Sequence, residues 1–209
     1  MSYGDPTILS SLSDLLPKII GQLPGCPPVA IRQQLQDTAE EFCRDTGALR
    51  AVVGPFDFTV DVKTYLIELP ILAVVNQVHR VYIYNVEQHP STYQVSLNSD
   101  CATVITFTST PSSTLTDAWT ADVSMNPHKG CEDFPSYFLA QWGHAIVAGT
   151  LAELMEDSTK RWQNPVKAQR NAQKYSLAKQ DAAFRRLQAS SKDGRLSFQN
   201  DEHFAGGFC

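Results

Sequence analysis

The sequence has no uncharged apolar stretch approaching the roughly 20 residues that a membrane-spanning helix requires, so no membrane contact is expected. Its first residues also lack the basic segment and apolar block of a secretory signal peptide, which predicts a protein made and used in the cytosol. The cysteines are odd in number and widely spaced, which argues against a disulfide framework and predicts reduced, structural thiols. They are Cys26, Cys43, Cys101, Cys131 and Cys209.

Short catalytic and nucleotide-binding motifs are missing as well. There is no Gly-rich dinucleotide or phosphate loop, no HExxH and no GxSxG. His128 and Cys131 have a metal-like spacing, but a zinc site needs about four such ligands and no second pair accompanies them. We therefore predict no catalytic residue, no cofactor and no metal, in a protein that is not an enzyme. The alternative from a different class, a cytosolic ligand-binding or hydrolytic domain, would need a convergent polar cleft.

Charge is divided unevenly along the chain. Residues 1–159 hold seven Lys and Arg against eighteen Asp and Glu, whereas residues 160–209 hold ten against four. An acidic body with a basic C-terminal part suits docking on an acidic protein, head-to-tail self-association or contact with phosphates. The alternative is a basic helix face that is only solvated. The basic residues of the last helix are expected to spread around it, which argues against sequence-specific DNA binding. They are Lys167, Arg170, Lys174, Lys179, Arg185 and Arg186.

Helical and strand-like sequence patterns alternate in residues 1–159. Apolar residues recur at helical spacing in residues 28–46, with Pro28 in the first turn and Gly47 as a C-cap. Residues 56–125 are poor in charge and alternate in polarity, which predicts about five strands of an antiparallel sheet. Within them "LPILAVVNQV" is compatible with a strand, a loop or a short buried helix. The helical period returns in "SYFLAQWGHAIVAGTLAELMED", whose wide apolar stripe predicts burial against more than one element.

The stretch "KRWQNPVKAQR" predicts a corner between two helices. Asn164 suits the N-cap position of the following helix and Pro165 its first residue, while Trp162 is expected to pack the joint. The face of the following helix consists mainly of small side chains, which contribute little burial each, so this helix depends on a neighbour or on another subunit. The predicted face is Ala168, Ala172, Tyr175, Ala178, Ala182 and Ala183.

Together these patterns predict an α+β protein in which three to four helices from both chain ends form a bundle with an inserted antiparallel β domain. The expected parts are helical residues 1–55, β-rich residues 56–125, helical residues 126–189 and an extended arm of residues 190–209. Apolar residues on an aperiodic tail are typical of a segment that orders against a partner, although a disordered terminus with incidental Phe stays open. The candidate docking residues of the arm are Arg195, Leu196, Phe198, Phe204 and Phe208.

Four short signatures in this order resemble the head-to-tail adaptor, or connector, proteins of tailed bacteriophages. They are the helix core from Ala39 to Cys43, "YLIELP", "VHRVYIYN" and the Trp-x-Asn-Pro turn at residues 162–165, and the resemblance spans about residues 25–188. The resemblance implies a virion protein at the head-tail interface, made in the host cytoplasm and assembled as a closed ring of twelve copies.

Such a ring docks beneath the portal protein, meets a tail or nozzle protein on its other side and lets genome DNA pass through its lumen without sequence preference. In this family C-terminal arms grip the portal, a role that residues 190–209 would fill. Whether the basic last helix meets protein or DNA stays open. A different neck or tail-completion protein is the alternative among virion components.

Overall fold

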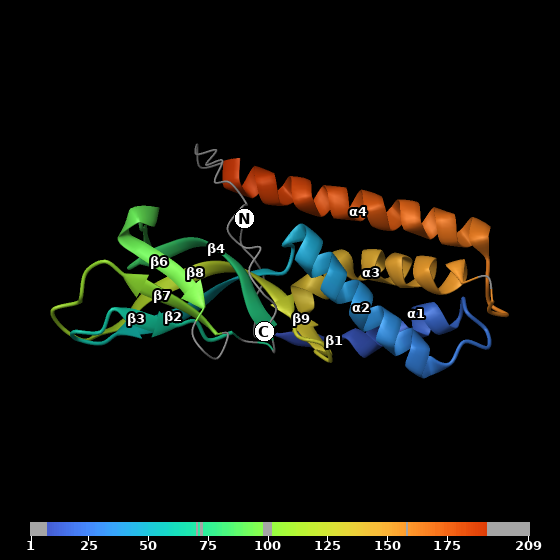
Figure 1. The fold of residues 1–209 in the computed structure, drawn as a ribbon, viewed down its shortest axis with the longest axis horizontal. Helices are drawn as coiled ribbons and strands as arrows, with labels where there is room; N and C mark the ends of the chain where they lie inside the picture. The colour runs from blue at the N-terminus through green and yellow to red at the C-terminus, as the bar shows by residue number, and fades with distance from the viewer. Residues whose placement is uncertain (1–7, 70, 72, 98–101, 158, 192–209) are drawn as a thin grey trace.

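The chain divides into a helical half and a β-rich half that lie end to end (Figure 1). The structure, a computed structural model, describes residues 8–191 except 70, 72, 98–101 and 158, and for residues 187–191 it describes the backbone alone. The predicted α+β class is confirmed. In the described part of the chain no helix is both long enough and apolar enough to cross a membrane.

Segments from both ends of the described chain build the helical half. The helices are a 3-10 turn η1 (Leu12–Leu15), α1 (Leu16–Ile20), α2 (Pro28–Thr46), α3 (Ser136–Glu156) and α4 (Pro165–Ser191). Both α2 and α4 pack against α3, and they also contact each other (Figure 1). Because neighbours cover several sides of α3, it is buried nearly all round, as its wide apolar stripe predicts.

The ends of α2 follow from two residues. Pro28 is its first residue, where the missing N–H costs nothing, and Gly47 ends it in the left-handed conformation with φ of +60°. The Gly47 N–H donates to the Cys43 carbonyl at 2.8 Å, which satisfies one of the last free carbonyls of the helix. The predicted apolar face is buried. Its members in the structure are Ile31, Leu35, Thr38, Ala39, Phe42, Cys43 and Thr46.

The β-rich half contains two antiparallel sheets instead of the one that the sequence suggests. The first has the strand order β2-β8-β4-β5 and the second β3-β7-β6. The strands are β2 (Arg50–Phe58), β3 (Thr64–Leu66), β4 (Ala73–Ile83), β5 (Val86–Glu87), β6 (Tyr93–Leu97, after the 3-10 turn η2, Pro90–Thr92), β7 (Thr103–Phe107) and β8 (Leu115–Pro127). They run from Arg50 to Pro127, a wider range than the expected residues 56–125. The undecided "LPILAVVNQV" contributes residues 73–78 to β4.

Aromatic side chains join the two sheets. Trp119 of β8 is buried, and its ring lies 5.6 Å from that of Phe107 in β7 and 5.9 Å from that of Tyr65 in β3, centroid to centroid. Phe58 of β2 stacks on the same indole at 6.3 Å. Aromatic pairs at such separations add to the burial energy of the rings, so Trp119 is the centre of the β-rich core.

Two further strands form a separate small sheet beside α3. β1 (Leu9–Ser11) pairs antiparallel with β9 (Asp133–Pro135), the strand that leads directly into α3.

In β4 the register against β8 shifts between Val75 and Gln77 and again between Val78 and Arg80, so that Asn76 and His79 are extra residues. Such bulges bend a strand and increase its local twist.

Candidate functional site

The helix corner lies between the end of α3 and the start of α4. The Asn164 side-chain oxygen accepts a hydrogen bond from the Lys167 N–H at 3.0 Å, and Pro165 is the first residue of α4. The Asn164 N–H donates to the Met155 carbonyl at 3.0 Å, which ties the cap to the last turn of α3. Trp162 is half-buried against the core, and its buried indole N–H has no hydrogen-bond partner among the described residues. The corner sets the direction of α4.

The candidate arm residues follow α4 in the sequence. Arg195, Leu196, Phe198, Phe204 and Phe208 all lie outside the described residues. The surface that leads toward them is α4 itself, which has two different sides.

The inner side of α4 packs closely on α2 and α3. Ala168 and Ala182 are buried, and Tyr175 and Ala178 are half-buried against the core. Ala172, expected on this face, is exposed instead, because at about 100° per residue it lies at the edge of the contact. Small residues allow the close approach that the sequence suggests, but the face is narrower than predicted.

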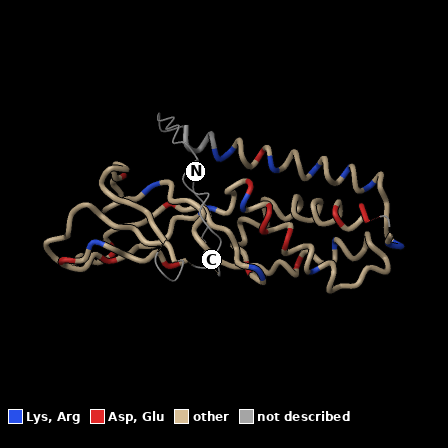
Figure 2. Tube along the Cα trace, in the orientation of Figure 1, with Lys and Arg blue, Asp and Glu red and all other residues tan. Residues whose placement is uncertain are grey.

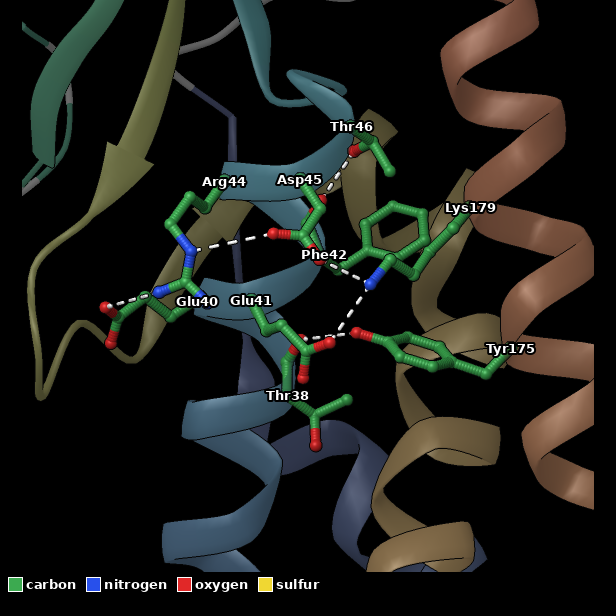
Figure 3. Close-up of polar contacts among 9 residues, drawn as sticks. All are labelled: Thr38, Glu40, Glu41, Phe42, Arg44, Asp45, Thr46, Tyr175 and Lys179. Carbon is green, nitrogen blue, oxygen red and sulfur yellow. Dashed lines mark hydrogen bonds and ion pairs between the residues drawn. The ribbon is translucent and has the colours of Figure 1, made fainter. Parts of the chain in front are cut away.

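Polar contacts fix the inner side of α4 to α2 (Figure 3). The Lys179 ammonium group donates to Glu41 at 3.0 Å and also to Asp45. One helical turn earlier, the Tyr175 hydroxyl donates to the Thr38 carbonyl at 3.3 Å. The Tyr175 ring also lies 6.0 Å from that of Phe42, centroid to centroid. A basic residue of the last helix is therefore neutralised by the acidic body of the same chain.

The basic residues of α4 divide between its inner side and one exposed flank. Lys179 points inward, and the Arg186 guanidinium lies 3.4 Å from the place where Gly47 would carry a β-carbon. The remaining four fall within about 60° of one another around the helix axis at 3.6 residues per turn. We call this set, Lys167, Arg170, Lys174 and Arg185, the basic flank. Figure 2 shows the Lys and Arg positions along α4 and the acidic ones along α2.

Large apolar side chains point away from the body on the outer side of α4, opposite the inner side that packs on α2 and α3. Val166 is 63% exposed, Leu177 65% and Phe184 58%. They are spaced 11 and 7 residues apart, close to three and two full turns, so they form one row about 27 Å long. We call these three residues the outer row. The basic flank runs along one side of it.

The His128–Cys131 pair lies beside α2, where a hollow of about 20 Å³ also borders Asp37 and Glu40. That volume holds about one water molecule. Burial raises the pKa of the Cys131 thiol, which donates a hydrogen bond to the Asp133 carbonyl at 3.3 Å. Within the described part of the chain, no three His, Cys, Asp or Glu side chains are placed to hold a metal ion.

A buried ion pair that the sequence did not reveal lies where the two halves meet. Arg50 of β2 donates to Asp122 of β8 through two nitrogens, at 2.7 and 2.5 Å, and both side chains are buried. Burial and then the charge of Arg50 lower the pKa of the nearby His79 to about 4. Its Nε2 is buried without a hydrogen-bond partner among the described residues. In the sequence the pair is visible only as two charged residues that lie beside apolar residues of two strands.

Comparison with known proteins gives no assignment. No protein-family model matches the chain, and no curated protein sequence is significantly similar to it. The surfaces of α2 and α4 are therefore the basis on which a function is proposed.

Proposed function

We propose that this chain is a structural subunit of the head-to-tail connector of a tailed bacteriophage. It would form a ring beneath the portal protein, link the portal to a tail or nozzle protein and let genome DNA pass through the lumen. The observation that carries the proposal is the two-sided α4. Its inner side is held by the body, whereas its outer row exposes three large apolar side chains along about 27 Å. This row supports the proposal of a protein–protein contact on this side of α4.

The arrangement of the elements also supports an assembly role. Helices from both chain ends pack side by side while the β-rich half extends beyond them, which leaves both halves of an elongated subunit accessible to neighbours (Figure 1). The order of helix, β-rich region, helix, Trp-x-Asn-Pro corner and basic helix is the order in which the resemblance to connector proteins was found. We propose that residues 190–209, which follow α4, are the arm that docks on the portal.

The direct test is to purify the full chain and record native mass spectra and negative-stain images, alone and with the portal protein encoded in the same genome. Closed rings, or a complex with the portal whose symmetry matches it, would support the proposal. Monomers that never bind the portal would contradict it. Binding to tail components alone would instead favour a different neck or tail-completion protein.

The arm is tested separately by deleting residues 190–209. We expect the shortened chain to keep the circular dichroism spectrum and melting temperature of the full chain but to lose portal binding. Unchanged portal binding would refute the role of the arm and leave the ring to be judged by the first experiment.

A further inference from the structure

The outer row of α4 needs a partner that is apolar and carries negative charge beside the apolar contact. Leu177 and Phe184 are each more than half exposed, although both are side chains that proteins usually bury. Phosphates would satisfy the basic flank but would leave these side chains in water. A protein surface can cover both at once, so the occupant of this side of α4 is a protein.

The basic flank specifies the charge of that protein. Asp181 pairs with Arg185 at 3.0 Å, but among the described residues no carboxylate pairs with Lys167, Arg170 or Lys174. Three cations therefore border the outer row with no countercharge from the part of their own chain that the structure describes. An acidic partner would supply it, and opposite charges across an interface steer association and fix its orientation.

The outer side of α2 in the same chain has the matching character. Residues 33, 37, 40 and 44 follow one another at helical spacing on the side of α2 opposite its buried face. The first three also border the small hollow beside residues 127–131. We call this set, Gln33, Asp37, Glu40 and Arg44, the outer face of α2. Val29, at the start of the same helix, is 80% exposed and adds an apolar contact.

The internal contact between α2 and α4 shows how such a pairing is made. Lys179 already joins α4 to Glu41 and Asp45 on one edge of α2. Asp37 lies one turn before Glu41, and among the described residues its side chain bonds only to the Gln33 amide, at 3.1 Å. Glu40 lies 3.9 Å from the half-exposed Arg44. The outer face of α2 thus offers the Asp37 carboxylate to an α4 from outside.

We infer that the outer row and basic flank of α4 in one copy of this chain bind the outer face of α2 in a second copy. The inference specifies the subunit contact of the proposed ring and so rests on the proposed function. Because the two surfaces differ, the interface is heterologous, and repeating it closes a ring when the rotation between copies permits.

Symmetric pairing of α4 with itself fits the charges less well. A two-fold axis that makes the helices antiparallel places the basic flank of one directly beside the basic flank of the other, which is repulsive. A two-fold axis that makes them parallel places it beside Gln169 and Gln180, which supply no countercharge. Only the contact with α2 pairs the cations.

Cross-linking between two singly substituted full-length chains tests the contact. One chain carries Leu177→Cys and the other Asp37→Cys, both in a background with Cys101→Ser and Cys209→Ser, because the other three cysteines are buried. A short bis-maleimide should join the two chains into a mixed dimer. In the matched control, Leu177→Cys is mixed with Thr64→Cys, an exposed position on β3 in the other half of the molecule, and should give at least tenfold less product.

Charge reversal gives the second readout. Lys174→Glu and Asp37→Lys should each raise the concentration needed for half-assembly at least tenfold, and mixing the two variants should restore assembly across the swapped pair. Leu177→Asp should have a comparable effect, with the melting temperature of each variant confirming that the monomer is folded.

The outcomes separate the inference from the proposed function. Rings that form without the 177–37 cross-link, and that tolerate all three substitutions, would overturn the inference while the connector role stands. A cross-link between two copies of Leu177→Cys alone would show symmetric pairing of α4 and overturn it too. Variants that lose DNA binding but keep assembly would assign the surface to nucleic acid. A chain that stays monomeric, alone and with portal, would overturn both.

Discussion

Tyr175 of α4 lies directly against the backbone of Gly149 in α3. A β-carbon on Gly149 would come within 2.9 Å of the Tyr175 ring and within 2.6 Å of the Thr38 methyl group of α2. These separations are shorter than ordinary van der Waals contacts, so a glycine is what allows three helices to meet at this point.

Gly149→Ala should therefore destabilise the protein. Overpacking costs about 1–3 kcal/mol, which exceeds the gain of about 1 kcal/mol from replacing glycine by alanine in a helix. The free energy of unfolding from urea titration should fall. Gly143→Ala in the same helix is the matched control, since its β-carbon would meet only the movable end of the Leu15 side chain at 3.2 Å. Equal stability of the two variants would contradict the tight contact.

Lys179→Met should loosen α4 from α2. It removes both ion pairs while keeping most of the aliphatic stem, and partly exposed pairs contribute about 1 kcal/mol or less. We expect faster amide hydrogen exchange in α4 and a stability that depends less on salt. Lys63→Met, which removes an exposed cation of the β-rich half with no carboxylate partner among the described residues, should change neither quantity.

Asn164→Ala should lower the free energy of unfolding by about 1 kcal/mol, because the Lys167 N–H loses its acceptor at the start of α4. The same change at the exposed Gln163 is the control and should be near neutral. Replacing Asn164 and Pro165 together should cost at least as much as the single change. A melting temperature equal to that of the native chain would argue against the cap.

His79 should make stability fall in mild acid. Burial and the Arg50 charge lower its pKa in the folded protein to about 4, whereas an unfolded histidine has a pKa of about 6.5. Between these values the unfolded chain binds a proton that the folded chain does not. The free energy of unfolding is therefore undiminished above pH 6.5 and decreases toward pH 4, by up to about 1.4 kcal/mol per pH unit.

The contribution of His79 is isolated by comparing the native chain with His79→Gln at pH 7 and pH 4.5. The native chain should lose about 2 kcal/mol more than the variant over this interval. An identical loss in both would show that other groups dominate the acid response.

Local signals explain what the sequence could predict. Pro28 and Gly47 mark the ends of α2 because their backbone preferences act within one turn, and the Asn164–Pro165 pair marks the start of α4 in the same way. The α+β class of the fold follows from the order of the helices and strands that such local signals mark along the chain.

Features that depend on contacts between residues far apart in the sequence could not be predicted. Strand periodicity cannot reveal that the strands divide between two sheets joined at Trp119, or that Asn76 and His79 interrupt the alternation of β4. The outer row was visible in the sequence only as three apolar residues. Which side of α4 is buried is decided by Gly149 and Glu41 on other helices, so this side could not be predicted from α4 alone.

The pairing of β1 with β9 and the contact of Tyr175 with Thr38 join residues more than 120 positions apart in sequence. Contacts of such long sequence separation slow folding, because a long loop must close before they form. During translation α2 and α3 emerge before α4, so the surface around Gly149 stays open to solvent until the ribosome has made the last helix. A product truncated before residue 165 would expose that surface permanently, and we expect it to aggregate.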